Sequence, residues 1–161
     1  MKEAYLDNAA TSKIDPRVLK EMMLYYTLEY GNPSSFHNKG KEAKDSIENA
    51  RNLISMILNC KSKEIVFTSG GTESINLALK GIAFANREDG NHIITTKIEH
   101  PAVLETCGFL SYRGFDITHL DVDKNGLVNP KDVEKAINDK TILISVMYAN
   151  NEIGTIQEIE E

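Results

Sequence analysis

The chain has 161 residues, 41% of them hydrophobic and 26% charged, which is the composition of a globular domain with a core. Its net charge of −6 argues against a surface that collects phosphate backbones, so we expect no nucleic-acid partner. We expect a cytoplasmic protein without a membrane partner, because the N-terminus lacks signal-peptide features and no segment reaches the about 20 apolar residues that span a bilayer. Cys60 and Cys107 stand alone, which predicts neither a disulfide framework nor a metal site.

Two helices are predicted at the start of the chain. Asp15 followed by Pro16 is typical of a capped helix start, and this helix is predicted to continue until Gly31. After a turn-rich segment, apolar residues recur at steps of three and four from Ala43 to Leu58. This spacing predicts one buried face of a second helix.

From residue 64 on, strands alternate with helices. Apolar and β-branched runs predict strands at residues 64–68, 92–96, 115–120 and 141–149. Helical periodicity predicts helices at residues 72–85, 101–113 and 129–137. The alternation indicates an α/β fold with a largely parallel sheet flanked by helices on both faces. This alternation is typical of sheets that continue with further strand–helix units, so we expect the sheet to be incomplete at residue 161.

A glycine-rich corner, Ser69-Gly70-Gly71-Thr72, lies between a predicted strand and a predicted helix. The first turn of a helix has unpaired N–H groups, and glycines let an anion approach the main chain, so the corner favours a phosphate. The pattern is neither the dinucleotide fingerprint nor the Walker motif, which leaves the phosphate monoester of a small cofactor. The alternative is that Ser69 or Thr72 merely caps the helix.

Polar residues follow two further predicted strands. His100 comes just after residues 92–96, at the end of the sheet where open α/β folds bind ligands, and its ring suits stacking and proton exchange. Asn150 and Asn151 follow the last predicted strand and have amides that suit a ring substituent. The alternatives are a surface histidine and an asparagine turn.

The segment from Asp121 to Asp132 matches several positions of a calcium-binding EF-hand loop. Such a loop must lie between two helices, whereas the preceding residues are strand-like and Pro130 fits the loop badly. We therefore favour a strand, an Asp/Asn-Gly turn and a capped helix over a calcium site.

Five ordered motifs together resemble the N-terminal part of cysteine desulfurases, which belong to the class V aminotransferase group of fold type I pyridoxal-phosphate enzymes. The motifs are YLDNAAT, GNPSSFH, FTSGGTES, KIEHPAV and YANNEIGTIQ, and they cover essentially the whole chain. The resemblance implies roles for six residues. Gly71 and Thr72 would bind the cofactor phosphate, His100 would stack on the pyridine ring as a catalytic residue, Asn151 would lie near the phenolic oxygen, and Asn8 and Ala9 would border the substrate pocket.

By the same resemblance, residues 1–15 belong to the small domain and residues 16–161 to an incomplete pyridoxal-phosphate-binding large domain. The implied activity converts L-cysteine to L-alanine and a persulfide, for iron–sulfur cluster or thio-cofactor assembly. The implied partners are a sulfur-acceptor scaffold protein and a second copy in a homodimer. The family's Ser-x-His-Lys lysine and nucleophilic cysteine have no counterpart here, so we expect the 161-residue chain alone to be inactive. Alternatives are a selenocysteine lyase, another class V aminotransferase, and a non-catalytic truncated remnant.

Overall fold

The computed structural model describes residues 3–160. The chain divides into two compact units, one that ends at Phe67 and one that begins at Thr68. This division into compact units does not test the predicted boundary after residue 15, which separates the small domain from the large domain. That boundary stays a prediction. None of the helices in the described range is long and apolar enough to cross a membrane.

The first unit holds two α-helices, α1 (Pro16–Thr27) and α2 (Asn38–Ile57), and a 3₁₀ turn, η1 (Ser62–Glu64). The start of α1 is confirmed, because the Asp15 side chain accepts a hydrogen bond from the Arg17 N–H at 2.8 Å. Its end comes earlier than the predicted limit at Gly31. The helix α2 begins before the predicted start, because the His37 ring caps it, and histidine is not among the preferred capping residues.

The strand predicted at residues 64–68 is wrong. Residues 65–68 have no regular structure, and the side chains of Val66 and Phe67 are 64% and 47% exposed. A strand needs a neighbouring backbone to receive its hydrogen bonds, and within residues 3–160 this segment has none. The segment therefore has strand-like side chains without strand pairing.

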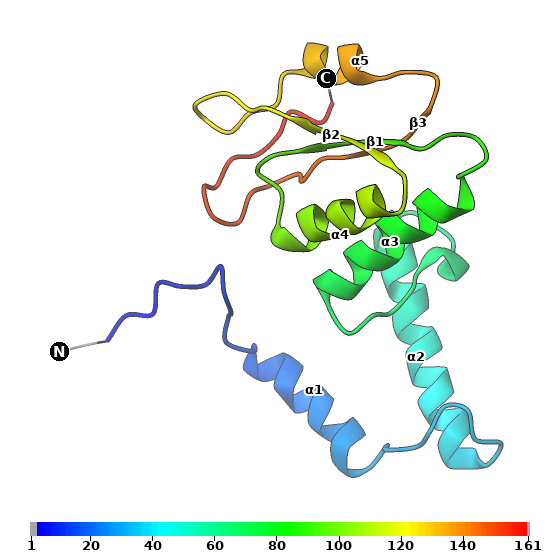
Figure 1. Cartoon of the computed structure of the whole chain (residues 1–161). Coiled ribbons are helices and arrows are strands. Elements are labelled where there is room, and N and C mark those ends of the chain that lie inside the picture. Colours follow the sequence, from blue (N-terminus) through cyan, green and yellow to red (C-terminus); the bar gives the residue numbers. More distant parts are fainter. Residues whose placement is uncertain (1–2, 161) are drawn as a thin grey trace. The chain divides into compact units, whose positions relative to one another are not determined.

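The second unit is an α/β fold, as predicted (Figure 1). Its helices and strands are α3 (Gly71–Ala85), β1 (His92–Thr96), α4 (Pro101–Tyr112), β2 (Asp116–Leu120), α5 (Pro130–Ala136) and β3 (Thr141–Ser145). The strands are parallel, in the order β2-β1-β3. The last strand is shorter than predicted, because its pairing with β1 ends at Ser145.

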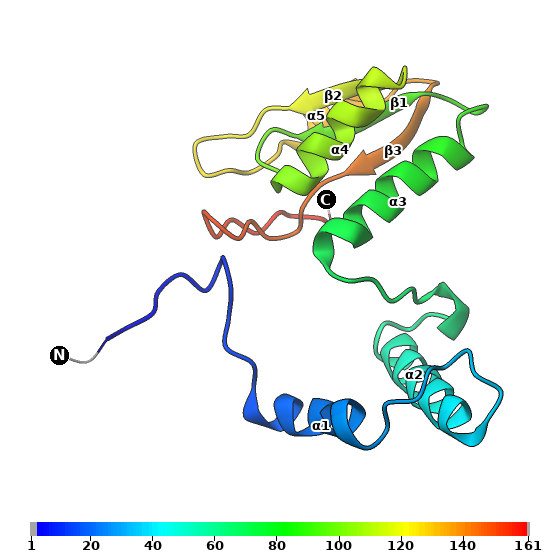
Figure 2. The same ribbon diagram turned by 60° about the horizontal axis from the view of Figure 1, so that its bottom comes forward.

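The helices α3 and α4 lie side by side on one face of this sheet, and α5 lies on the other (Figures 1 and 2). Ile93 of β1 belongs to one buried hydrophobic cluster with Leu79 and Ala83 of α3 and with Cys107 and Leu110 of α4. All of β1 is buried, as expected for the middle strand of a parallel sheet. The sheet thus places the residues that follow β1 and β3 at its carboxyl end.

Candidate functional site

The corner before α3 is open and has unpaired donors. Within the described residues, the backbone N–H groups of Gly71, Thr72 and Glu73 have no acceptor, and the first helical bond runs from the Ser74 N–H to the Gly70 carbonyl at 3.1 Å. A Cβ added at Gly70 or Gly71 would meet nothing within 4 Å, and the φ of Gly70, 164°, is extended. Neither crowding at the two positions nor the φ of Gly70 therefore requires glycine here, and the space in front of the main chain is open.

The capping alternative for this corner is not supported by the hydrogen bonds. Ser69 donates through its N–H and its hydroxyl to the Glu73 carboxylate, at 2.6 Å each, so it does not cap the helix as an acceptor. These two bonds lower the pKa of Glu73. The hydroxyl of Thr72 bonds to no atom of residues 3–160. An anion in the corner would have to coexist with the Glu73 charge, which lies on the Ser69 side.

His100 is the N-cap of α4. Its Nδ1 accepts a hydrogen bond from the Ala102 N–H at 3.0 Å, so the neutral ring carries its proton on Nε2. The ring is exposed, and Nε2 has no partner in the described part of the chain. The capping bond thus holds the ring at Nδ1 and leaves Nε2 open to a ligand.

The two asparagines after β3 have different surroundings. The Asn150 amide donates to the Ile98 carbonyl at 2.9 Å and accepts from the N–H groups of Glu152 and Ile153. It is therefore used by the turn itself. Asn151 is exposed, and its amide makes no hydrogen bond with the described residues. Of the pair, Asn151 is the one whose amide is available for a ligand.

Glu99 is absent from the residues predicted from the sequence, because one acidic residue after a strand carries no spacing signal. Its side chain is buried, 7% exposed, and its Oε1 accepts from the Met147 N–H at 2.7 Å and from the Thr96 hydroxyl at 3.1 Å. Burial raises the pKa of this carboxyl, against the lowering effect of the two bonds. A buried carboxylate with two donors, beside His100 in the chain, belongs to the candidate site.

A hollow of about 300 Å³ joins several of these groups. Glu99, His100, Asn150 and Asn151 line it, together with Lys97, whose ammonium lies 2.6 Å from Asp121. The structure therefore brings His100 and Asn151 together. Gly71 and Thr72 belong to the same unit but do not line this hollow, and residue 68 ends no strand.

Asn8 and Ala9 lie in the first unit, in an exposed turn. Their role beside a substrate stays a prediction.

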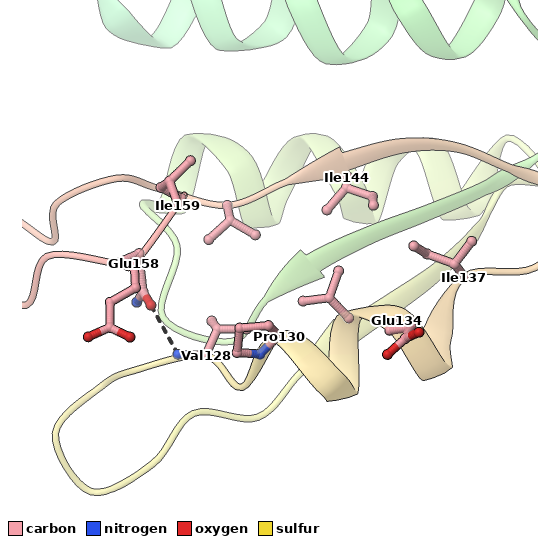
Figure 3. Close-up of a pocket in the computed structure, with 10 residues that line it drawn as sticks. Val128, Pro130, Glu134, Ile137, Ile144, Glu158 and Ile159 are labelled. Carbon is pink, nitrogen blue, oxygen red and sulfur yellow. Dashed lines mark hydrogen bonds between the residues drawn. The ribbon is translucent and has the colours of Figure 1, made fainter. Parts of the chain in front are cut away.

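A larger hollow of the second unit, about 460 Å³, is mostly apolar (Figure 3). Ile137, Ile144 and Ile159 line it, together with Glu134 and Glu158. It contains no histidine, cysteine or amide pair in an open position, so its size does not make it a site of chemistry.

Within residues 3–160, no three side chains of histidine, cysteine, aspartate or glutamate come together as a group that could hold a metal ion. In the segment considered for calcium, Asp123 accepts from the N–H groups of Asn125 and Leu127, at 2.8 Å each. These bonds lower its pKa and are those of an Asx turn. Pro130 then starts α5, which Asn129 caps, as predicted.

The two cysteines differ in burial, and Cys107 does not have the surroundings of a nucleophile. Cys107 is fully buried in the core, where desolvation, together with the charge of Glu99, raises its thiol pKa to about 11. It is therefore a neutral thiol at pH 7, whereas the nucleophilic form is the thiolate. Cys60 is half-buried after α2.

Comparison with known proteins finds close similarity over nearly the whole chain. Residues 4–161 match the family model described as Aminotransferase class-V. The chain is 54% identical to the protein named Cysteine desulfurase IscS of Methanosarcina thermophila and 53% identical to that of Dictyoglomus turgidum. These alignments cover 99% of this chain but only 40% and 41% of the relatives, so the chain spans about two fifths of their length.

Solved structures are similar as well. One titled as a NifS-like protein matches with a TM-score of 0.91 and 46% identity, over 95% of this chain and 42% of that one. Another, titled "SspA in complex with cysteine", matches with a TM-score of 0.88 and 43% identity, over 94% of this chain and 44% of the other.

Proposed function

Since this chain belongs to the aminotransferase class-V family, we propose that it is the N-terminal part of a cysteine desulfurase that uses pyridoxal 5′-phosphate. The relatives named above are cysteine desulfurases, which supports this activity. Because this chain spans only part of their length, the activity is proposed for the whole protein and not for the chain alone. A selenocysteine lyase and another class V aminotransferase remain the alternatives within the family. A non-catalytic remnant is the alternative from outside it.

The open corner is the observation that carries the cofactor assignment. The free N–H groups of Gly71 and Thr72, with the Thr72 hydroxyl, would hold the phosphate at the positive end of the α3 dipole. His100 would lie against the ring, and Asn151 would donate its amide to the ring's phenolic oxygen. When bound, pyridoxal phosphate supplies a ring that accepts electrons from the bonds of an amino acid.

His100 is the residue of this chain that would move a proton. Its Nδ1 is occupied by the Ala102 N–H, so any proton transfer uses Nε2. Because the capping bond to α4 restrains the ring, Nε2 would keep the same position from one proton transfer to the next. The role is therefore both to orient the cofactor and to exchange a proton.

The proposed reaction converts L-cysteine and an enzyme thiol into L-alanine and an enzyme persulfide. The carbon–sulfur bond of the substrate breaks, a sulfur–sulfur bond forms at the thiol, and protons return to the carbon fragment, so no external oxidant or reductant is needed. The similar structure with bound cysteine supports this substrate. Cys107, which is neutral and buried, does not supply this thiol. By the family resemblance Cys60 does not supply it either, so we assign the thiol to the part of the relatives' length that this chain does not span.

The persulfide sulfur would pass to an acceptor scaffold protein, and the protein would act as a homodimer. The cytoplasm stays the predicted compartment.

Titration with pyridoxal phosphate tests the cofactor assignment. In the protein at its natural length, Thr72→Ala should weaken binding by about 1–2 kcal/mol, the value of one hydrogen bond to a charged group. The matched control is Ser111→Ala, an exposed hydroxyl on α4 that makes no side-chain bond within the described residues. Equal affinity in Thr72→Ala and the control would mean that the corner does not hold the phosphate.

Product analysis separates the alternatives. With pyridoxal phosphate and L-cysteine, the natural-length protein should release sulfide and L-alanine in equal amounts under a reductant. Release only from selenocysteine would favour the lyase, and transfer of the amino group would favour an aminotransferase. No turnover of any amino acid would favour the remnant.

A further inference from the structure

Glu99 joins the two chain segments that carry the candidate residues. It directly precedes His100 on the segment after β1, and its Oε1 bonds to the Met147 N–H on the segment after β3, at 2.7 Å. Four residues beyond that contact lies Asn151. The Thr96 hydroxyl, at 3.1 Å from the same oxygen, holds the carboxylate from the β1 side.

Backbone pairing does not hold these segments together. The ladder between β1 and β3 ends at the pair Thr95 and Ser145. Beyond it, no backbone–backbone hydrogen bond connects residues 96–100 with residues 146–151. Their direct hydrogen bonds are made by two side chains, Glu99 to Met147 and Asn150 to the Ile98 carbonyl.

We propose that Glu99 is a positioning residue, whose carboxylate keeps His100 and Asn151 at a fixed separation across the carboxyl ends of β1 and β3. The inference rests on the proposed function for the identity of the ligand, pyridoxal phosphate. The bond across the segments is itself a property of the protein without ligand.

The geometry requires an acceptor oxygen and not a negative charge. Both groups that reach Oε1 are donors, a backbone N–H and a hydroxyl. The amide oxygen of a glutamine has the same shape and accepts both bonds. Burial, which raises the pKa of this carboxyl, also disfavours its charge. Glu99→Gln should therefore retain the positioning, whereas Glu99→Ala should lose it.

The experiment compares Glu99→Ala, Glu99→Gln and a control, Glu105→Ala, in the natural-length protein. Glu105 is exposed on α4 and makes no side-chain hydrogen bond with the described residues. The first measurement is hydrogen exchange of the Met147 amide and of residues 146–151 without cofactor. The second is the dissociation constant of pyridoxal phosphate, from its absorbance.

Glu99→Ala should speed exchange at the Met147 amide by about tenfold or more and raise the dissociation constant by about tenfold, as expected when a partly buried N–H loses its acceptor. Glu99→Gln and the control should stay within about threefold of the original protein in both measurements, below the effect of one lost bond. A general loss of stability would instead speed exchange throughout the sheet, including the amides of β1.

Three outcomes would overturn the proposal: Glu99→Gln as impaired as Glu99→Ala, unchanged exchange at Met147 in Glu99→Ala, or unchanged cofactor affinity in Glu99→Ala when the original protein binds the cofactor. If the original protein binds no pyridoxal phosphate, the proposed function fails and, with it, the ligand named here. The exchange data then still decide whether Glu99 connects the segments.

Discussion

Asn150 and Asn151 show how the fold separates two side chains that are alike in the sequence. Asn150 bonds to the Ile98 carbonyl and to two N–H groups of its own turn. Asn151 makes no such bond in the described part and lines the hollow beside His100. The sequence identifies both as turn formers, and only the direction of the turn leaves one of them available.

The two cysteines should differ in reactivity toward a thiol reagent. Burial raises the pKa of Cys107 to about 11, so its reactive thiolate is scarce at neutral pH and is also inaccessible. In the 161-residue chain under native conditions at pH 7.5, about one thiol per chain should react with a disulfide reagent, and the second only in denaturant. Cys60→Ser should remove the fast reaction. Rapid labelling of Cys107 in the native protein would contradict this packing of α4.

The carboxyl of Glu99 should make stability depend on pH. Its folded-state pKa is raised by burial above the ordinary value of glutamate. The folded state therefore binds the proton more tightly than the unfolded state, and this stabilisation is complete below the ordinary pKa and is lost as pH rises through the raised one. As the pH rises through that window, the free energy of unfolding of the original protein should fall relative to that of Glu99→Gln. Urea titration of both proteins at several pH values measures this difference. A difference that is constant with pH would contradict the assignment.

At the scale of helices and strands, different side chains hold the two ends of the sheet. At the amino end, the buried ring of His92 on β1 bonds to the Thr141 hydroxyl of β3 at 2.7 Å and to the Thr118 hydroxyl of β2 at 2.8 Å. At the carboxyl end, Glu99 connects the segments after β1 and β3. The ring nitrogens of His92 are therefore used within the protein, whereas His100 and Asn151, which line the hollow, follow the carboxyl ends of β1 and β3.

Two glycines of the second unit should respond oppositely to alanine. A Cβ at Gly90 would collide with the Lys140 carbonyl, where the chain enters β1 and β3, whereas a Cβ at Gly108 in α4 would meet nothing within 4 Å. Gly108→Ala should stabilise by about 0.5–1 kcal/mol through helix propensity. Gly90→Ala should destabilise by about 1–3 kcal/mol through overpacking. Urea unfolding checks both, and stabilisation by Gly90→Ala would show that this approach of the two segments is looser than described.

At the scale of the whole molecule, the second unit presents apolar surface beside an outer strand. Both β2 and β3 are edges of the sheet. Ile137, Ile144 and Ile159 around the apolar hollow are 50%, 42% and 58% exposed. Edge strands next to exposed apolar side chains favour association with another chain.

The 161-residue chain should therefore self-associate or aggregate. Sedimentation velocity should show species larger than a monomer that increase with concentration, because association covers the hollow and the β3 edge. Ile144→Lys should reduce association, since it places a charge on that edge strand. The control is Tyr112→Lys, at an 89% exposed position at the end of α4. A monomer at all concentrations, with cooperative unfolding, would contradict the prediction.

Local patterns determined much of the second unit. Proline at the first helical position marked the starts of α4 and α5, and the β-branched run of residues 92–96 marked β1 with the observed limits. The motifs also indicated the family, which the match over residues 4–161 confirms. These features depend on neighbours in the chain, so the sequence is sufficient to predict them.

Only the tertiary structure decided the features that need distant partners. Residues 64–68 have strand-like side chains but no neighbouring backbone in the described chain, and pairing cannot be deduced from propensity. The bond from Glu99 to Met147 joins residues 48 positions apart, and the free amide of Asn151 depends on the bonds made by Asn150. Burial and hydrogen bonds between such segments arise when the chain folds, and for that reason they leave no periodic signal in the sequence.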